Sequence, residues 1–190
     1  MKMQVEVTGN GPLLVFVPGG LTGWLSWEPH ARRLSSTRKV ARVQLLNVEY
    51  GIKGQPLPAD YSVRTESNAL KATLDELRPN KPVDIIAWSY GAMVTLDYAL
   101  NYADRVRSLT LIEPPAFWVL EGKLDLDAKK TVQMLRTLRG DISEDMLEEF
   151  MQGVGMAQPG QPLRKLPQWS VWSRHRHSLR NSPCCIRSQR

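Results

Sequence analysis

The sequence predicts an α/β fold, with a mostly parallel β-sheet, flanking helices and an inserted helical lid. The main observation is a set of three strand candidates at residues 13–17, 83–87 and 106–112, each close to a Pro or Gly, of which Leu13-Leu14-Val15-Phe16-Val17 is a continuous apolar run. Runs that are apolar throughout, rather than alternating, are typical of strands buried on both faces of a parallel sheet. Helix-like segments separate these runs, and the order strand, helix, strand, helix, strand favours right-handed crossovers.

The first third of the chain supplies the early strands of this sheet. Val5 and Val7 alternate with polar residues, as expected for a strand with one exposed face. The elements expected here are, in order, a strand around residues 5–7, a turn at 9–11, a buried strand at 13–17, a helix at 26–34, a strand at 40–46 and a loop at 47–59.

The middle of the chain continues the same alternation. Leu70, Leu74 and Leu77 recur at i, i+4 and i+7, which predicts an amphipathic helix packed on the sheet. The elements expected from here on are this helix, a strand at 83–87, a helix at 91–102, a strand at 106–112 and two lid helices at 126–139 and 143–151.

The distribution of charge divides the chain. The formal net charge is +6, yet residues 1–150 carry 18 basic and 19 acidic side chains. Residues 151–190 carry seven basic side chains and no acidic one. We therefore expect a core at residues 1–115, a helical lid at 116–163 and an irregular basic tail at 164–190.

Composition excludes several classes of protein. The chain is 42% hydrophobic, which is too apolar for a disordered protein, and no stretch reaches the roughly 20 apolar residues of a membrane span. The first residues lack the apolar run of a signal peptide. Two adjacent cysteines, Cys184 and Cys185, cannot form a disulfide framework. We expect a cytoplasmic globular protein without membrane contact, and nothing in the sequence implies a metal or an organic cofactor.

The most informative motif joins the run at 83–87 to the helix that follows it. Ala87-Trp88-Ser89-Tyr90-Gly91 places a serine between two small residues. A sharp strand-to-helix turn of this kind strains the backbone of the serine and exposes its hydroxyl, and small residues are needed where strand and helix pass closely. The motif alone also fits an ordinary serine in a turn.

In its context the motif resembles the nucleophile elbow of the α/β-hydrolase fold family, with Ala87 in place of the first glycine. The strand at 13–17 and the following Pro18-Gly19-Gly20 are similar to the family's oxyanion loop, with proline where histidine is usual. The resemblance implies that Ser89 is the nucleophile and that the backbone amides of Gly20 and Tyr90 form the oxyanion hole.

Three tryptophans lie near these motifs. By the same resemblance, Trp24 and Trp88 are expected to line the substrate pocket. Trp27 either lies at the pocket mouth as well or packs in the interior of the protein.

The resemblance also implies a catalytic acid and a histidine base. Glu113 directly follows the strand at 106–112 and is the candidate acid. The alternative for Glu113 is a solvated or salt-bridged residue at the end of a strand. Asp125 and Asp127 are expected at helix starts or on the lid surface. His30 lies in a predicted surface helix. His175 and His177 have arginine neighbours, which disfavour the imidazolium that a general base must become.

No sequence after Arg164 resembles the two further strands and the histidine loop that complete this family's fold. We therefore expect an incomplete hydrolase fold, truncated after the lid. The apolar run at 106–112 would then be an edge strand, through which the chain could associate with itself.

The leading functional hypothesis is a serine hydrolase that acts on an ester or similar small carbonyl substrate, impaired by the missing histidine. One alternative is a non-catalytic remnant or binding module of the same fold. Another is binding of nucleic acid or an anionic surface by the tail, for which Trp169 and Trp172 could stack on bases. A solvated tail without a partner is preferred to this last reading.

Overall fold

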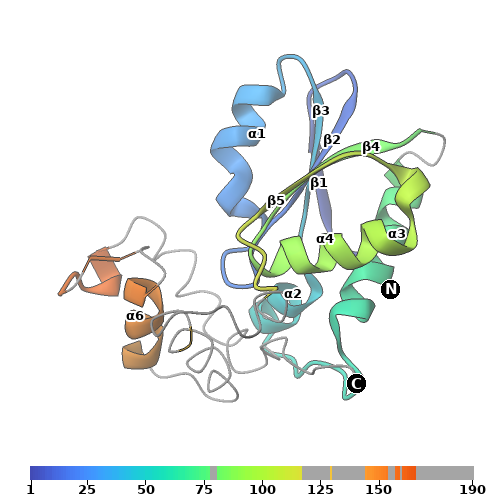
Figure 1. Ribbon diagram of the computed structural model, residues 1–190. Coiled ribbons are helices and arrows are strands. Elements are labelled where there is room, and N and C mark those ends of the chain that lie inside the picture. The colour runs from blue at the N-terminus through green and yellow to red at the C-terminus, as the bar shows by residue number, and fades with distance from the viewer. Residues whose placement is uncertain (78–80, 117–128, 130–143, 154–156, 159, 166–190) are drawn as a thin grey trace.

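The fold is a five-stranded, mostly parallel sheet with helices on both faces, which confirms the predicted class (Figure 1). The computed structural model describes residues 1–77, 81–116, 129, 144–153, 157–158 and 160–165. The strands are β1 (Val5–Thr8), β2 (Leu13–Val17), β3 (Lys39–Val43), β4 (Val83–Trp88) and β5 (Val106–Ile112).

The strand order in space is β1-β3-β2-β4-β5. β1 runs antiparallel to β3, whereas β3, β2, β4 and β5 all run parallel to one another. The carboxyl ends of these four parallel strands therefore meet at one edge of the sheet. That edge is the usual position of a ligand site in an open α/β sheet.

Each face of the sheet is covered by different helices. Alternation along β2 shows the division: Leu14 and Phe16 are buried in one hydrophobic cluster, Val15 and Val17 in another. Figure 1 shows α1 on one side of the sheet and α3 and α4 on the other. The elements on these faces are η1 (Trp24–Trp27), α1 (Glu28–Leu34), α3 (Val63–Leu77) and α4 (Tyr90–Asn101).

The loop expected at residues 47–59 is wrong in its first part, because residues 46–52 form the helix α2 (Leu46–Ile52). The strand expected at 40–46 correspondingly ends at Val43. No side chain next to α2 caps its first turn. The cap comes instead from α3, where the Glu66 carboxylate accepts hydrogen bonds from the backbone amides of Leu46 and Asn47, each at 2.9 Å. A remote cap of this kind leaves no local signal at the helix start.

Beyond β5 the structure describes less of the chain. The helix expected at 143–151 is confirmed as α6 (Glu144–Gly153), and a 3₁₀ turn, η4 (Leu163–Lys165), follows it. Another 3₁₀ turn, η2 (Ala103–Arg105), directly precedes β5. The helix expected at 126–139 and residues 166–190 lie outside the described ranges. The division into core, lid and tail therefore stays a prediction.

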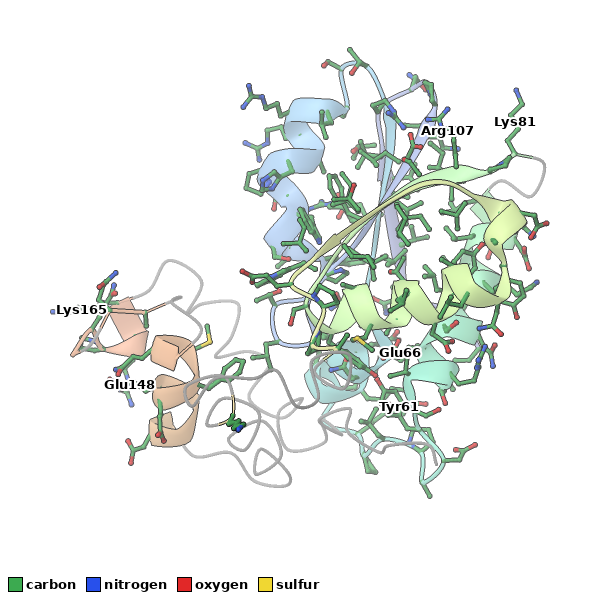
Figure 2. All side chains as sticks on the ribbon, in the orientation of Figure 1. Tyr61, Glu66, Lys81, Arg107, Glu148 and Lys165 are labelled. Carbon is green, nitrogen blue, oxygen red and sulfur yellow. The ribbon has the colours of Figure 1, made fainter. Side chains whose placement is uncertain are left out.

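A cluster of charged groups joins the amino ends of β4 and β5. Buried Asp84 accepts hydrogen bonds from the Arg107 and Ser108 side chains, each at 2.7 Å, and also pairs with Arg38. The hydrogen bonds from Arg107 are the main cause that holds the pKa of Asp84 well below its usual range. Figure 2 shows Arg107 at the end of the sheet opposite Tyr61 and Glu66.

We expect Asp84→Asn to lower the free energy of unfolding at pH 7 by about 2 kcal/mol, since hydrogen bonds to a charged group are lost. The depressed pKa of Asp84 contributes stability above its unfolded value of 3.8. That stability is lost as the pH falls below this value. The difference in free energy of unfolding between wild type and Asp84→Asn should therefore become smaller at low pH. Urea unfolding at several pH values measures this. Glu76→Gln, which breaks the exposed pair with Lys2, is the control, and equal losses in both variants would contradict the prediction.

β5 is the outermost described strand on its side of the sheet. Its backbone can pair with another chain, so we expect the protein to scatter light with a mass above that of a monomer. A lysine at the exposed middle of β5, Thr110→Lys, should lower that mass, whereas Thr8→Lys on the opposite edge strand should not. A monomeric wild-type chain at all concentrations would contradict this.

Candidate active site

Ser89 occupies the sharp turn between β4 and α4 that the sequence motif predicts. Its backbone has φ 52° and ψ −125°, a conformation that is strained for any residue except glycine. The turn is held on both sides, because the Ser89 amide donates to the carbonyl of Ile112 at 2.9 Å and its carbonyl accepts from the Ala92 amide at 2.9 Å. Ser89 is half-buried.

The small residue two positions after the serine is required by contact with β2. A Cβ atom at Gly91 would lie 2.1 Å from the carbonyl oxygen of Pro18, and something would have to shift. The first turn of α4 therefore lies directly against the segment that leaves β2. Ala87, the small residue two positions before the serine, is fully buried.

The two residues expected to form the oxyanion hole come together. A Cβ atom at Gly20 would lie 3.1 Å from Cδ1 and 3.4 Å from Cβ of Tyr90. Gly20 is buried, and its carbonyl accepts a hydrogen bond from the Asn47 side-chain amide at 3.0 Å. Gly20, Ser89 and Tyr90 thus lie at one edge of the sheet, beside the amino end of α4.

Glu113 follows β5 at this same edge. Trp88 pairs with Ile112 in the sheet, so Glu113 and Ser89 are the next residues of two neighbouring strands. Glu113 also has a positive φ, 47°, and its side chain is exposed. The structure therefore brings Glu113 beside the serine turn, and among the described residues no histidine is hydrogen-bonded to it.

The tryptophans differ in their surroundings. Trp24 is half-buried in η1, and its backbone amide donates to the Gln44 side chain at 2.8 Å. The half-buried Trp88 ring lies against Gly19, where a Cβ atom would be 3.2 Å from it. Trp27 is buried and stacks on Phe16, with ring centroids 4.5 Å apart, as its packing alternative predicts.

Sequence reasoning missed a buried polar network beneath this edge. Glu66 is fully buried and accepts from the Tyr61 hydroxyl at 2.5 Å as well as from the two α2 amides. The Tyr61 and Tyr90 hydroxyls lie 3.0 Å apart. Figure 2 shows Tyr61 and Glu66 close together beside α2. One signal was available: Glu66 lies four positions before Leu70, on the apolar stripe of α3.

Burial dominates the electrostatics of this network. It raises the pKa of Glu66, although hydrogen bonds from Tyr61 and the two amides act in the opposite direction. Burial likewise raises the pKa of Tyr61, and the neighbouring Tyr90 and Glu66 add to the effect. The Tyr61 hydroxyl therefore keeps its proton and remains a donor at neutral pH.

Of the three histidines in the sequence, the structure describes His30. It is exposed on α1, with its ring edge-on to Trp27 at a centroid distance of 5.3 Å. This agrees with the surface position expected for it. His175 and His177, and the lid residues Asp125 and Asp127, lie outside the described residues.

Comparison with known proteins agrees with this geometry. The sequence pattern of the alpha/beta hydrolase fold family matches residues 12–151, and the chain belongs to this family. Over 170 residues it is 30% identical to a pimeloyl-[acyl-carrier protein] methyl ester esterase of Methylococcus capsulatus, covering 86% of this chain and 62% of that protein. Over 108 residues it is 31% identical to a 2-hydroxy-6-oxo-2,4-heptadienoate hydrolase of Pseudomonas putida, covering 57% and 36%.

Solved structures show the same fold. An alpha/beta hydrolase from Sphaerobacter thermophilus superimposes with a TM-score of 0.63 at 20% identity, covering 93% of this chain and 66% of that one. The chain thus spans less than two thirds of the length of these relatives. Within the described ranges, no helix combines the length and apolar character needed to cross a membrane.

We expect Gly91→Ala to lower the free energy of unfolding by about 2 kcal/mol, because the new methyl group would overlap the Pro18 carbonyl. Gly54→Ala is the control: its Cβ atom meets nothing within 4 Å, and only the positive φ opposes it, at a cost of about 1 kcal/mol. Thermal and urea unfolding compare the two variants. A loss at Gly91 no larger than that at Gly54 would mean that the contact is not tight.

Proposed function

We propose that the chain is a serine hydrolase that acts on an ester or a similar small carbonyl substrate, with Ser89 as the nucleophile. The observation that carries this proposal is the strained backbone of Ser89 at a strand-to-helix turn. Strain of this kind persists where the surrounding structure enforces it, and it clusters at functional sites. The name of the Methylococcus relative, a methyl ester esterase, supports the ester class.

The proposed reaction begins with addition of the Ser89 Oγ to the substrate carbonyl carbon, while a general base takes the hydroxyl proton. The amides of Gly20 and Tyr90 and the amino end of α4 stabilise the negative charge on the carbonyl oxygen. The bond to the leaving alcohol then breaks, the alcohol takes the proton, and an acyl-serine remains. Water hydrolyses it in a second addition of the same kind.

In this proposal Glu113 orients a histidine that acts as the base. Among the described residues, His30 is exposed on α1 with its ring against Trp27, and no hydrogen bond joins it to Ser89 or Glu113. Turnover by this chain should therefore be feeble, because loss of one triad member typically leaves about 10³- to 10⁴-fold catalysis over water. Trp24 and Trp88 are proposed to line the pocket, and the lid to cover it.

The position of His30 also favours a second candidate, a non-catalytic member of the family that binds small apolar ligands. In either case the proposed partner is a small molecule and the proposed compartment is the cytoplasm. Binding of nucleic acid by the tail stays a prediction that is less favoured than a solvated tail without a partner. Trp169 and Trp172, which it would use, lie outside the described residues.

We expect a fluorophosphonate probe to label the wild-type chain, and Ser89→Ala to abolish the labelling, because the probe reacts with an activated serine hydroxyl. Ser67→Ala, at a buried serine of α3, is the matched control and should be labelled like the wild type. Intact-mass spectrometry after a time course measures the extent. A wild-type chain that stays unlabelled would favour the binding candidate, and labelling that survives in Ser89→Ala would refute the assignment of the nucleophile.

A further inference from the structure

The buried carboxylate of Glu66 is the centre of two hydrogen-bonded branches that end at the candidate oxyanion hole. It is fully buried, and a buried charge is tolerated only where donors compensate it. Three donors do so: the amides of Leu46 and Asn47 and the hydroxyl of Tyr61. All three suit the ionised carboxylate, which can only accept.

The first branch reaches Gly20 through Asn47. Glu66 holds the Asn47 backbone amide at 2.9 Å, and the Asn47 side chain donates to the Gly20 carbonyl at 3.0 Å. Asn47 is itself fully buried, so its side chain has little freedom to leave this position. Glu66 therefore acts through Asn47 to fix the orientation of the Gly20 carbonyl group, which lies next to the Gly20 amide in the chain.

The second branch reaches Tyr90 through Tyr61. The single hydroxyl proton of Tyr61 goes to Glu66, so in the contact between the two tyrosines the Tyr90 hydroxyl donates and the Tyr61 oxygen accepts. The Tyr90 ring also lies against Gly20. Both candidate oxyanion residues are therefore attached to one carboxylate on α3.

We propose that Glu66, Tyr61 and Asn47 are positioning residues, which hold Gly20 and Tyr90 in the geometry that an oxyanion requires. The inference rests on the proposed function of these two amides. An oxyanion hole works because its donors are oriented before charge develops, and a supporting shell of locked side chains provides that orientation. A cap for α2 would need only the two amide contacts, whereas the Tyr61 and Asn47 side-chain contacts lead away from α2 toward the serine turn.

The kinetic test compares Tyr61→Phe with the control Tyr98→Phe, which removes a buried tyrosine hydroxyl further along α4. With the fluorophosphonate probe, Tyr61→Phe should lower the maximal labelling rate about tenfold and change the half-saturating probe concentration less than twofold. A tenfold loss is a third to a half, in free energy, of the roughly 10²- to 10³-fold cost of deleting an oxyanion donor outright. Tyr98→Phe should leave both values unchanged. Unchanged labelling in Tyr61→Phe would overturn the proposal, as would an equal loss in the control.

A second measurement does not depend on catalysis. Backbone amide order parameters from NMR, about 0.85 for rigid positions, should fall at Tyr90 in Tyr61→Phe and at Gly20 in Asn47→Ala, and stay unchanged in Tyr98→Phe. If the wild-type chain is never labelled, the proposed function fails and these order parameters alone decide whether the network positions the loop. Order parameters that stay at wild-type values in both variants would overturn the proposal. If one of the two variants does not fold, the other still tests its own branch.

Discussion

The contact between Gly91 and the carbonyl of Pro18 is the constraint on which the candidate site depends. Because Gly91 has no side chain, the first turn of α4 can pack directly against Pro18, the residue after β2. Any Cβ atom at this position would overlap the Pro18 carbonyl. The chain must therefore turn sharply at Ser89, with a backbone that a non-glycine residue rarely adopts. The same approach brings Tyr90 against Gly20. One steric requirement thus produces both the strained serine and the meeting of the two candidate oxyanion residues.

The polar groups at the two ends of β4 have complementary roles. At its amino end, Asp84 gathers two arginines and a serine, which fixes the register against β5. At its carboxyl edge, Glu66 reaches across from α3, starts α2 and supports the loop of Gly20. Neither carboxylate lies in the reaction that we propose. Both stabilise the strands and loops between which a strained turn can persist.

Much of the fold could be predicted because its signals are local. The continuous apolar run of β2 and the aliphatic residues of β4 indicate buried parallel strands, and the spacing of small residues around Ser89 indicates the turn. α2 could not be predicted, since its amides are satisfied by Glu66, about 20 positions away. Tyr61 and Asn47 escaped detection for the same reason: nothing in a single sequence shows which distant polar side chains will meet. The candidate oxyanion residues Gly20 and Tyr90 could be proposed because they adjoin recognisable motifs, and their role stays a prediction.

The strand order has a consequence for synthesis of the chain. β2 lies between β3 and β4, and its Leu14 pairs with Asp84, 70 positions later. During synthesis, the edge of β2 that pairs with β4 therefore stays unpaired until about 70 further residues have been made. Pairings so distant in sequence form slowly. Until then the nascent chain presents an unpaired, hydrophobic strand, which is the kind of surface that chaperones shield from other chains.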